Sequence, residues 1–227
     1  MHADKSPGDV LPVYDDAVGI PTSGACFLLP GPAGMLEAVL TYSARPDASA
    51  PIAVVCHPHP LYGGTLSNKV VHMVSMAFNA LGAMTLRFNF RGVGQSDGRF
   101  DLGEGEVKDM LAAVGWMRER FEFSPLWLAG FSFGAFVAWS GVRQAGAERL
   151  LLVAPPVAMF EFEQNDAVDV PWVVIQGCAD EVVDADSVSR WVKQQARPPR
   201  YECLNDAGHF FHGRLIPLRE RIVHAWR

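Results

Sequence analysis

The sequence predicts an α/β fold in which helices flank an eight-stranded, mostly parallel sheet. Three observations support this prediction. Short apolar runs alternate with longer segments of helical periodicity, several of these runs are apolar at almost every position, and a chain of 227 residues suits one domain of this class. We expect a single domain over residues 1–227, with an irregular segment over residues 1–22.

The predicted strands are short runs rich in β-branched and other apolar residues. They are Cys26–Leu29, Leu36–Tyr42, Ile52–Cys56, Met84–Phe90, Leu126–Ala129, Leu150–Val153, Trp172–Ile175 and Tyr201–Leu204. The first two have no helix between them, so they predict an antiparallel hairpin at one edge of the sheet. The later strands alternate with helices, which implies right-handed crossovers and parallel pairing.

The predicted helices carry apolar residues at helical spacing, which indicates that one face packs on the sheet. Ser67 or Asn68 can cap the first helix, which ends at Gly82. The others are Glu104–Arg120, Ser132–Val142, Asp186–Gln195 and Leu215–Trp226.

The composition excludes several classes of protein. Hydrophobic residues make up 49% of the chain and charged residues 19%, a balance incompatible with intrinsic disorder. The net charge of −6 argues against nucleic-acid binding. The apolar run Leu150–Phe160 is too short to span a membrane, and Met1–Pro12 lacks the apolar block of a secretory signal. We therefore expect a cytoplasmic monomer or homodimer that acts on a small molecule.

The four cysteines are Cys26, Cys56, Cys178 and Cys203. Their spacing shows no paired pattern, and each lies in an apolar, strand-like stretch. Such positions are typical of reduced thiols in the core of a cytosolic protein. We expect neither a disulfide nor a metal site from them.

The segment Gly130-Phe131-Ser132-Phe133-Gly134 is a G-x-S-x-G pattern. It directly follows a predicted strand and precedes a predicted helix, which is the setting of a nucleophile elbow. Glycines two positions before and after the serine avoid a clash in that tight turn. Ser132 is therefore the candidate nucleophile, and a helix start capped by a serine is the alternative.

A serine nucleophile needs a base, and the base needs an acid that orients it. Two later strands run into turns that carry these groups. Trp172–Ile175 leads to Asp180, and Tyr201–Leu204 leads to His209. We therefore expect Ser132, Asp180 and His209 to form a catalytic triad.

Other residues of the same types compete for these roles. They are Glu181, Asp184, Asp186, His57 and His212. Asp180 is favoured because it lies nearest to the end of its strand, whereas Asp184 and Asp186 suit the start of the next helix. His209 is favoured because Gly208 gives its loop conformational freedom.

With these turns the chain resembles, from Phe27 onward, a small, lidless, bacterial-type serine hydrolase of the α/β-hydrolase superfamily. The resemblance rests on the blocks His57–Gly64 and Arg91–Gly98, on the elbow, and on the acid and histidine turns in that order. It implies an α/β-hydrolase fold that uses no cofactor. Cap domains of this superfamily usually follow the strand placed at Leu150–Val153, and Ala154–Val170 is too short to form one.

An acyl-transfer site also needs two backbone N–H groups that hold the oxyanion. The resemblance places one at Phe133, directly after the nucleophile. The other should come from the loop after the third strand, whose two prolines have no N–H. Among His59, Leu61 and Tyr62 we favour Leu61, with His59 next.

Two features near this loop have structural interpretations. His57 and His59 form an H-x-H pair, but two ligands are too few for a metal site, so we expect them to shape the loop. Arg91–Gly98 is expected to be a glycine-shaped turn that supports the site. No metal is predicted.

The predicted substrate site is open and walled by apolar residues. They are Leu61, Tyr62, Phe133, Val157, Met159, Phe160, Val182, Phe210 and Phe211, with Tyr62, Val182 and Phe210 as the principal candidates. Such a wall suits acyl chains or aromatic acids. We therefore expect hydrolysis of a carboxylic ester or thioester through an acyl-enzyme. The alternatives are a peptidase or amidase, an acyltransferase with the same triad, and a non-catalytic binding protein.

Overall fold

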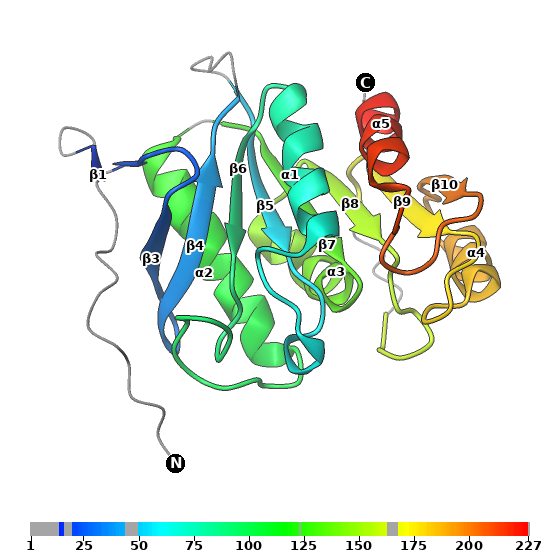
Figure 1. Ribbon diagram of the computed structural model, residues 1–227, viewed down its shortest axis with the longest axis horizontal. Helices are drawn as coiled ribbons and strands as arrows, with labels where there is room; N and C mark the ends of the chain where they lie inside the picture. Colours follow the sequence, from blue (N-terminus) through cyan, green and yellow to red (C-terminus); the bar gives the residue numbers. More distant parts are fainter. Residues whose placement is uncertain (1–13, 16–19, 44–49, 123, 163–167, 227) are drawn as a thin grey trace.

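The computed structural model describes residues 14–15, 20–43, 50–122, 124–162 and 168–226 (Figure 1). Its main sheet has eight strands in the order β10-β9-β8-β7-β5-β6-β4-β3. They are β3 (Cys26–Gly31), β4 (Gly34–Thr41), β5 (Ile52–Cys56), β6 (Met84–Phe88), β7 (Leu126–Phe131), β8 (Arg149–Val153), β9 (Trp172–Gly177) and β10 (Arg200–Leu204). The predicted fold class and each of the eight predicted strands are confirmed.

Strand pairing is parallel over most of this sheet and antiparallel at one edge. The strands from β6 through β5 to β10 pair in parallel. The hairpin of β3 and β4 is antiparallel, as predicted, and β4 is also antiparallel to β6. Every residue of β5, β7 and β9 is buried, which explains why these strands are apolar at almost every position.

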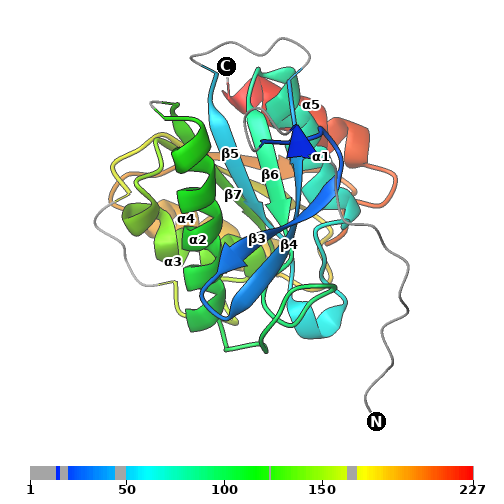
Figure 2. The same cartoon turned by 90° about the vertical axis from the view of Figure 1, so that its left-hand side faces the viewer.

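In the described part of the chain, five α-helices cover the two faces of the sheet. They are α1 (Lys69–Ala80), α2 (Glu104–Arg120), α3 (Phe133–Ala145), α4 (Ala185–Gln194) and α5 (Leu215–Trp226). Helices α1 and α5 pack on one face, and α2, α3 and α4 pack on the other (Figure 2). The Asn68 side chain accepts the N–H groups of Val70 and Val71, so Asn68 rather than Ser67 caps α1.

Two predictions concern the ends and insertions of the domain. The irregular segment expected over residues 1–22 lies mostly outside the described residues, and within it β1 (Tyr14–Asp15) pairs antiparallel with β2 (Ile20–Pro21). Between β8 and β9, residues 154–162 and 168–171 form no further helix or strand, so the part of this connection that the structure describes contains no cap. No helix among the described residues has the length and apolar character needed to cross a membrane.

The parallel strands present their carboxyl ends at one edge of the sheet. There β5, β7, β8, β9 and β10 end at Cys56, Phe131, Val153, Gly177 and Leu204. The loops that follow these strands carry most of the sequence-predicted site residues. The fold therefore gathers, at one edge, residues that are far apart in the chain.

Candidate active site

Ser132 occupies a tight turn between β7 and α3. Its backbone has φ 54° and ψ −121°, with φ in the left-handed region that residues with a side chain rarely adopt. Such a conformation costs on the order of 1–3 kcal/mol. The turn is held by hydrogen bonds from the Ser132 N–H to the Val153 carbonyl (2.9 Å) and from the Ala135 N–H to the Ser132 carbonyl (2.8 Å). The Ser132 side chain thus stands at the carboxyl edge of the sheet.

The glycines two positions before and after Ser132 are required by close backbone contacts. A Cβ atom on Gly130 would lie 2.0 Å from the carbonyl oxygen of Gly134, and one on Gly134 would lie 2.3 Å from the carbonyl oxygen of Cys56. Because neither obstacle is a flexible side chain, any larger residue would displace the turn. Packing therefore accounts for both glycines of the G-x-S-x-G pattern.

Ser132, His209 and Asp180 form a chain of hydrogen bonds. Nε2 of His209 lies 3.0 Å from Oγ of Ser132, and Nδ1 lies 2.9 Å from Oδ2 of Asp180. The exposed fractions of the His209 and Asp180 side chains are 3% and 0%. Because a carboxylate accepts at Nδ1, that nitrogen carries the ring proton, and Nε2 can accept the proton of the serine hydroxyl. The structure thus brings the three predicted residues together, although Ser132 and His209 are 77 positions apart.

The turn after β9 surrounds the Asp180 carboxylate with donors. Oδ1 accepts the N–H groups of Val182 (2.8 Å) and Val183 (2.7 Å). Oδ2 accepts Nε2 of Gln176 (2.9 Å) in addition to Nδ1 of His209. Burial raises the pKa of this carboxyl, but the hydrogen bonds from His209 and from the backbone outweigh burial, and the pKa of Asp180 lies below its ordinary value. Asp180 is therefore ionised at neutral pH.

The competing acidic residues have other partners. Glu181 accepts the backbone N–H of His209 on Oε2 at 3.2 Å, so it contacts the histidine loop rather than the imidazole ring. Asp184 caps α4 by accepting the Ser187 N–H at 2.9 Å, and Asp186 lies in the first turn of that helix. Both aspartates thus open the helix, as the sequence indicates.

The backbone N–H groups of Phe133 and His59 donate to no acceptor in the described part of the chain. The N–H of Leu61, which the sequence favours for the oxyanion, donates to Nδ1 of His59 at 3.2 Å. The N–H of Tyr62 donates to the His59 carbonyl at 3.1 Å. The rings of His59 and Phe133 have centroids 4.9 Å apart, which places the loop after β5 beside the elbow. The pair with free N–H groups is therefore Phe133 and His59, whereas Leu61 is already engaged.

His57, the other histidine of that loop, is completely buried. Its Nε2 accepts the Phe90 N–H at 3.0 Å, so its Nδ1 carries the proton and donates to the Pro58 carbonyl at 2.6 Å. Burial lowers the pKa of His57 to about 3. His57 is thus a neutral ring that ties the loop after β5 to the segment after β6. Among the residues that the structure describes, no cluster of His, Cys, Asp or Glu is arranged to hold a metal ion.

The segment Arg91–Gly98 forms a turn after β6. The buried Arg91 guanidinium donates to both carboxylate oxygens of Asp109 in α2, at 2.8 and 3.0 Å. Three glycines in the turn have positive φ, as its glycine-rich sequence predicts. Arg91 is therefore engaged in holding the turn against α2.

Three exposed apolar or aromatic side chains lie in the loops that carry the site residues. Tyr62, Val182 and Phe210 have exposed fractions of 86%, 43% and 41%. The ring centroid of Tyr62 lies 4.8 Å from that of His59, and the centroid of Phe210 lies 5.0 Å from that of His209. Phe210 thus adjoins the His209 ring, Val182 lies in the Asp180 turn, and Tyr62 adjoins His59 in the loop after β5.

Two predicted wall residues are buried in the core. Phe133 is 1% exposed and lies on the side of α2, α3 and α4, whereas Phe211 is completely buried on the side of α1 and α5. The Phe211 backbone has φ 51°, and its N–H donates to the Gly208 carbonyl in a tight turn. This reversal of the chain leaves Phe210 exposed and sends Phe211 into the core.

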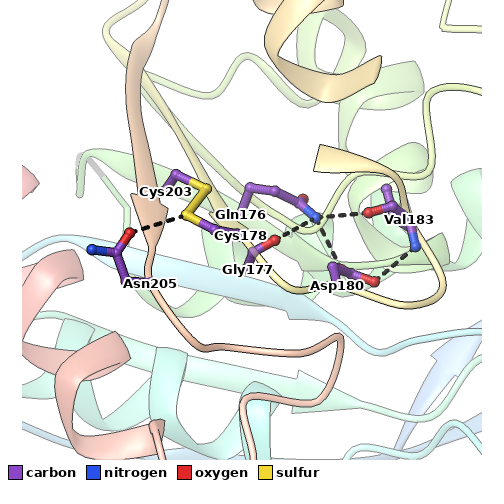
Figure 3. Close-up of a disulfide and its surroundings, with 7 residues drawn as sticks. All are labelled: Gln176, Gly177, Cys178, Asp180, Val183, Cys203 and Asn205. Carbon is purple, nitrogen blue, oxygen red and sulfur yellow. Dashed lines mark hydrogen bonds between the residues drawn. A yellow bond between two sulfur atoms is a disulfide. The ribbon is translucent and has the colours of Figure 1, made fainter. Parts of the chain in front are cut away.

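The expectation of four reduced cysteines is wrong for two of them. Cys178, directly after β9, forms a disulfide with Cys203 in β10, and their Cα atoms are 5.5 Å apart (Figure 3). In the parallel pairing of these strands Cys203 lies opposite Gln176, which brings the two cysteines together across 25 positions. Spacing alone did not reveal this pair. Cys26 and Cys56 are free.

Sequence reasoning missed two polar residues that contact the triad. Gln176 donates to the acid, and Glu181, weighed only as a rival acid, accepts the backbone N–H of the histidine. The available signal for Gln176 was an amide in an otherwise apolar, buried strand. For Glu181 no pattern in the sequence indicated its partner.

Comparison with known proteins gives a family match and several curated relatives. The model of the X-Pro dipeptidyl-peptidase (S15) family matches residues 39–166. That segment includes the elbow and ends before the acid and histidine turns. An uncharacterized protein of Rickettsia prowazekii, RP471, is 38% identical over 191 residues, which cover 80% of this chain and 79% of that protein.

Two solved structures are similar over most of the chain. An alpha-beta serine hydrolase homologue from Coxiella burnetii is 42% identical with a TM-score of 0.87, covering 91% of this chain and 99% of that one. A serine hydrolase without lid from Xanthomonas campestris is 40% identical with a TM-score of 0.85, covering 91% and 94%. Both similarities therefore concern the whole fold rather than a single motif.

Proposed function

Since the chain belongs to the X-Pro dipeptidyl-peptidase (S15) family and has the fold of lidless α/β serine hydrolases, we propose that it cleaves a carboxylic ester or thioester through an acyl-enzyme. The observation that carries the proposal is the hydrogen-bonded chain from Ser132 through His209 to Asp180. A free serine is a weak nucleophile, and this chain supplies the base and the acid that activate it.

In the first half-reaction Oγ of Ser132 attacks the carbonyl carbon while Nε2 of His209 takes the hydroxyl proton. The carbonyl oxygen becomes an oxyanion, which accepts hydrogen bonds from the N–H groups of Phe133 and His59. The bond to the leaving group then breaks, and the leaving oxygen or sulfur takes the proton from Nε2.

In the second half-reaction water replaces the leaving group. Nε2 of His209 takes a proton from the water as its oxygen attacks the acyl carbon. The second tetrahedral species collapses, Oγ of Ser132 regains the proton, and the carboxylic acid leaves. Throughout, Asp180 keeps the imidazole tautomer and stabilises its protonated form.

The substrate should present an apolar group beside the serine. The bordering side chains of Tyr62, Val182 and Phe210 are apolar or aromatic and exposed, and Arg91 is engaged with Asp109 rather than free for a charged substrate. Burial of apolar area stabilises a bound ligand by about 25 cal/mol per Å². We therefore favour esters and thioesters of apolar acids.

A peptidase is the second candidate, because the family whose model matches this chain is named for an X-Pro dipeptidyl-peptidase. The same triad cleaves amides when His209 protonates the leaving nitrogen. An aminoacyl-prolyl anilide, compared with a series of acyl esters and thioesters of increasing chain length, separates the two candidates through kcat/KM.

The first test is labelling with a fluorophosphonate, followed by intact mass. We expect one adduct on the parent protein and none on Ser132→Ala. The control is Ser140→Ala, which replaces an exposed serine in α3 and should take one adduct. The ester-hydrolysis rate of Ser132→Ala should fall by about 10⁴-fold or more. A folded parent that takes no adduct, or a Ser132→Ala variant that keeps its esterase activity, would overturn the proposal.

A further inference from the structure

Gln176 is a polar residue at a core position. It lies in β9, whose six residues are all buried, and its side chain is completely shielded from solvent. Its carbonyl oxygen Oε1 has no hydrogen-bond partner among the described residues. Burying an amide oxygen without a donor is unfavourable, so an apolar side chain of the same size would suit this strand better.

The amide nitrogen of Gln176 lies within the acid turn. Nε2 donates to Oδ2 of Asp180 at 2.9 Å and to the Val183 carbonyl at 3.0 Å, and it lies 3.4 Å from the Gly177 carbonyl (Figure 3). One side chain thus joins the strand, the far end of the turn and the carboxylate. The turn is also held without Gln176, because the backbone N–H groups of Val182 and Val183 already donate to Oδ1 of Asp180.

The distinctive contact is the one with Oδ2. This oxygen also accepts Nδ1 of His209 at 2.9 Å, so Gln176 and His209 share one acceptor. The backbone bonds to Oδ1 hold the other end of the carboxylate. Together the donors on both oxygens fix the plane of the group, and with it the direction in which Oδ2 faces the imidazole.

We propose that Gln176 is a positioning residue for the reaction, which holds the Asp180 carboxylate in the plane that orients His209 toward Ser132. The inference rests on the proposed function. Gln176 touches neither substrate nor reacting atoms and acts only through Asp180. Its unpartnered Oε1 is then a structural disadvantage that accompanies a gain in catalysis.

The test is Gln176→Met, which keeps an unbranched side chain of similar length and removes both N–H donors. We expect kcat for an ester to fall about 10-fold with KM unchanged, because a misplaced catalytic group loses rate rather than binding. Gln195→Met is the matched control. Gln195 is also buried and donates to a backbone carbonyl, that of Trp191, away from the triad. It should keep the parent kcat.

A second readout does not depend on turnover. The downfield proton resonance of the His209 Nδ1–H, which reports its bond to Asp180, should shift or broaden in Gln176→Met and remain unchanged in Gln195→Met. Gln176→Leu provides a second apolar side chain if the methionine variant does not fold. Thermal unfolding of each variant shows whether a loss of rate reflects a loss of folded protein.

Two results would overturn the inference while the parent remains an active serine hydrolase. One is a folded Gln176→Met with the kcat and resonance of the parent. The other is a loss of kcat that equals the loss of folded protein. If the parent itself neither labels nor hydrolyses an ester, the proposed function fails first, and that failure is visible before any variant is made.

Discussion

His209 and His57 are both buried histidines in loops at the carboxyl edge of the sheet. The ring nitrogens of His209 contact side chains, whereas those of His57 contact backbone groups. His209 lies between the Asp180 carboxylate and the Ser132 hydroxyl. His57 lies between a backbone N–H and a backbone carbonyl. Of the two, only His209 has a carboxylate at one nitrogen and a serine hydroxyl at the other.

This difference shows that being a buried histidine is not enough for a residue to act as a general base. The His57 ring donates and accepts within the backbone, and burial holds its pKa at about 3, so it stays neutral. In the proposed reaction, the carboxylate beside His209 would stabilise the positive charge that forms on its ring. The partners of the two ring nitrogens thus distinguish His57, which holds a loop, from His209, the proposed base.

The largest expected effect is the difference in kcat between a variant of His209 and the same variant of His57. His209→Gln should lower kcat for an ester by about 10⁴-fold or more, because an amide cannot accept the serine proton. His57→Gln, whose amide can still accept from Phe90 and donate to Pro58, should lose about 10-fold or less. Steady-state hydrolysis by both folded variants is the measurement. Equal losses would remove the distinction.

A smaller effect concerns acid stability. Below pH 6.5 the unfolded chain binds a proton on His57, and the folded chain does not until about pH 3, so acidification favours unfolding. From this ring alone, the free energy of unfolding should fall by about 1.4 kcal/mol for each pH unit in that window.

Urea unfolding of the parent and His57→Gln at several pH values between 6.5 and 4.5 tests this expectation. The parent should show the steeper decline, since all other titrating groups are shared. Parallel declines would mean that His57 titrates alike in the folded and unfolded chains.

The smallest expected effect on activity concerns the cysteines near His57 and near the partner of His209. Cys56, directly before His57, is free, whereas Cys178, two residues before Asp180, forms a disulfide with Cys203. Alkylation of the denatured chain should modify two cysteines without reductant and four after reduction. Reduction should change kcat only within about twofold, because no donor to the Asp180 carboxylate belongs to a cysteine. Four modified cysteines in the oxidised sample would contradict the pairing.

Much of the fold was predictable because its signals are local. The apolar run of β5 and the edge hairpin follow from side-chain type and spacing alone, and the sequence limited the cap of α1 to Ser67 or Asn68. The order of serine, acid and histidine along the chain, each after a strand, also predicted which three residues would meet. Parallel strands bring their carboxyl ends to one edge, so position along the chain translates into position in space.

Other features were not predictable because they depend on contacts between distant segments. The Cys178–Cys203 bond follows from the register of β9 on β10. The burial of Phe211 follows from one backbone reversal. The engagement of the Leu61 N–H depends on the rotamer of His59, which packs against Phe133 from another loop.

The sequence by itself determined the alternation of strands and helices, the strained serine turn with its two glycines, and the three residues that meet at the sheet edge. These depend on local propensity and on chain order. Only the tertiary structure decided which ring nitrogen faces which partner, which N–H groups stay free, and that Gln176 reaches the acid. Hydrogen bonds are short and directional, so their partners are set by how separate loops pack together.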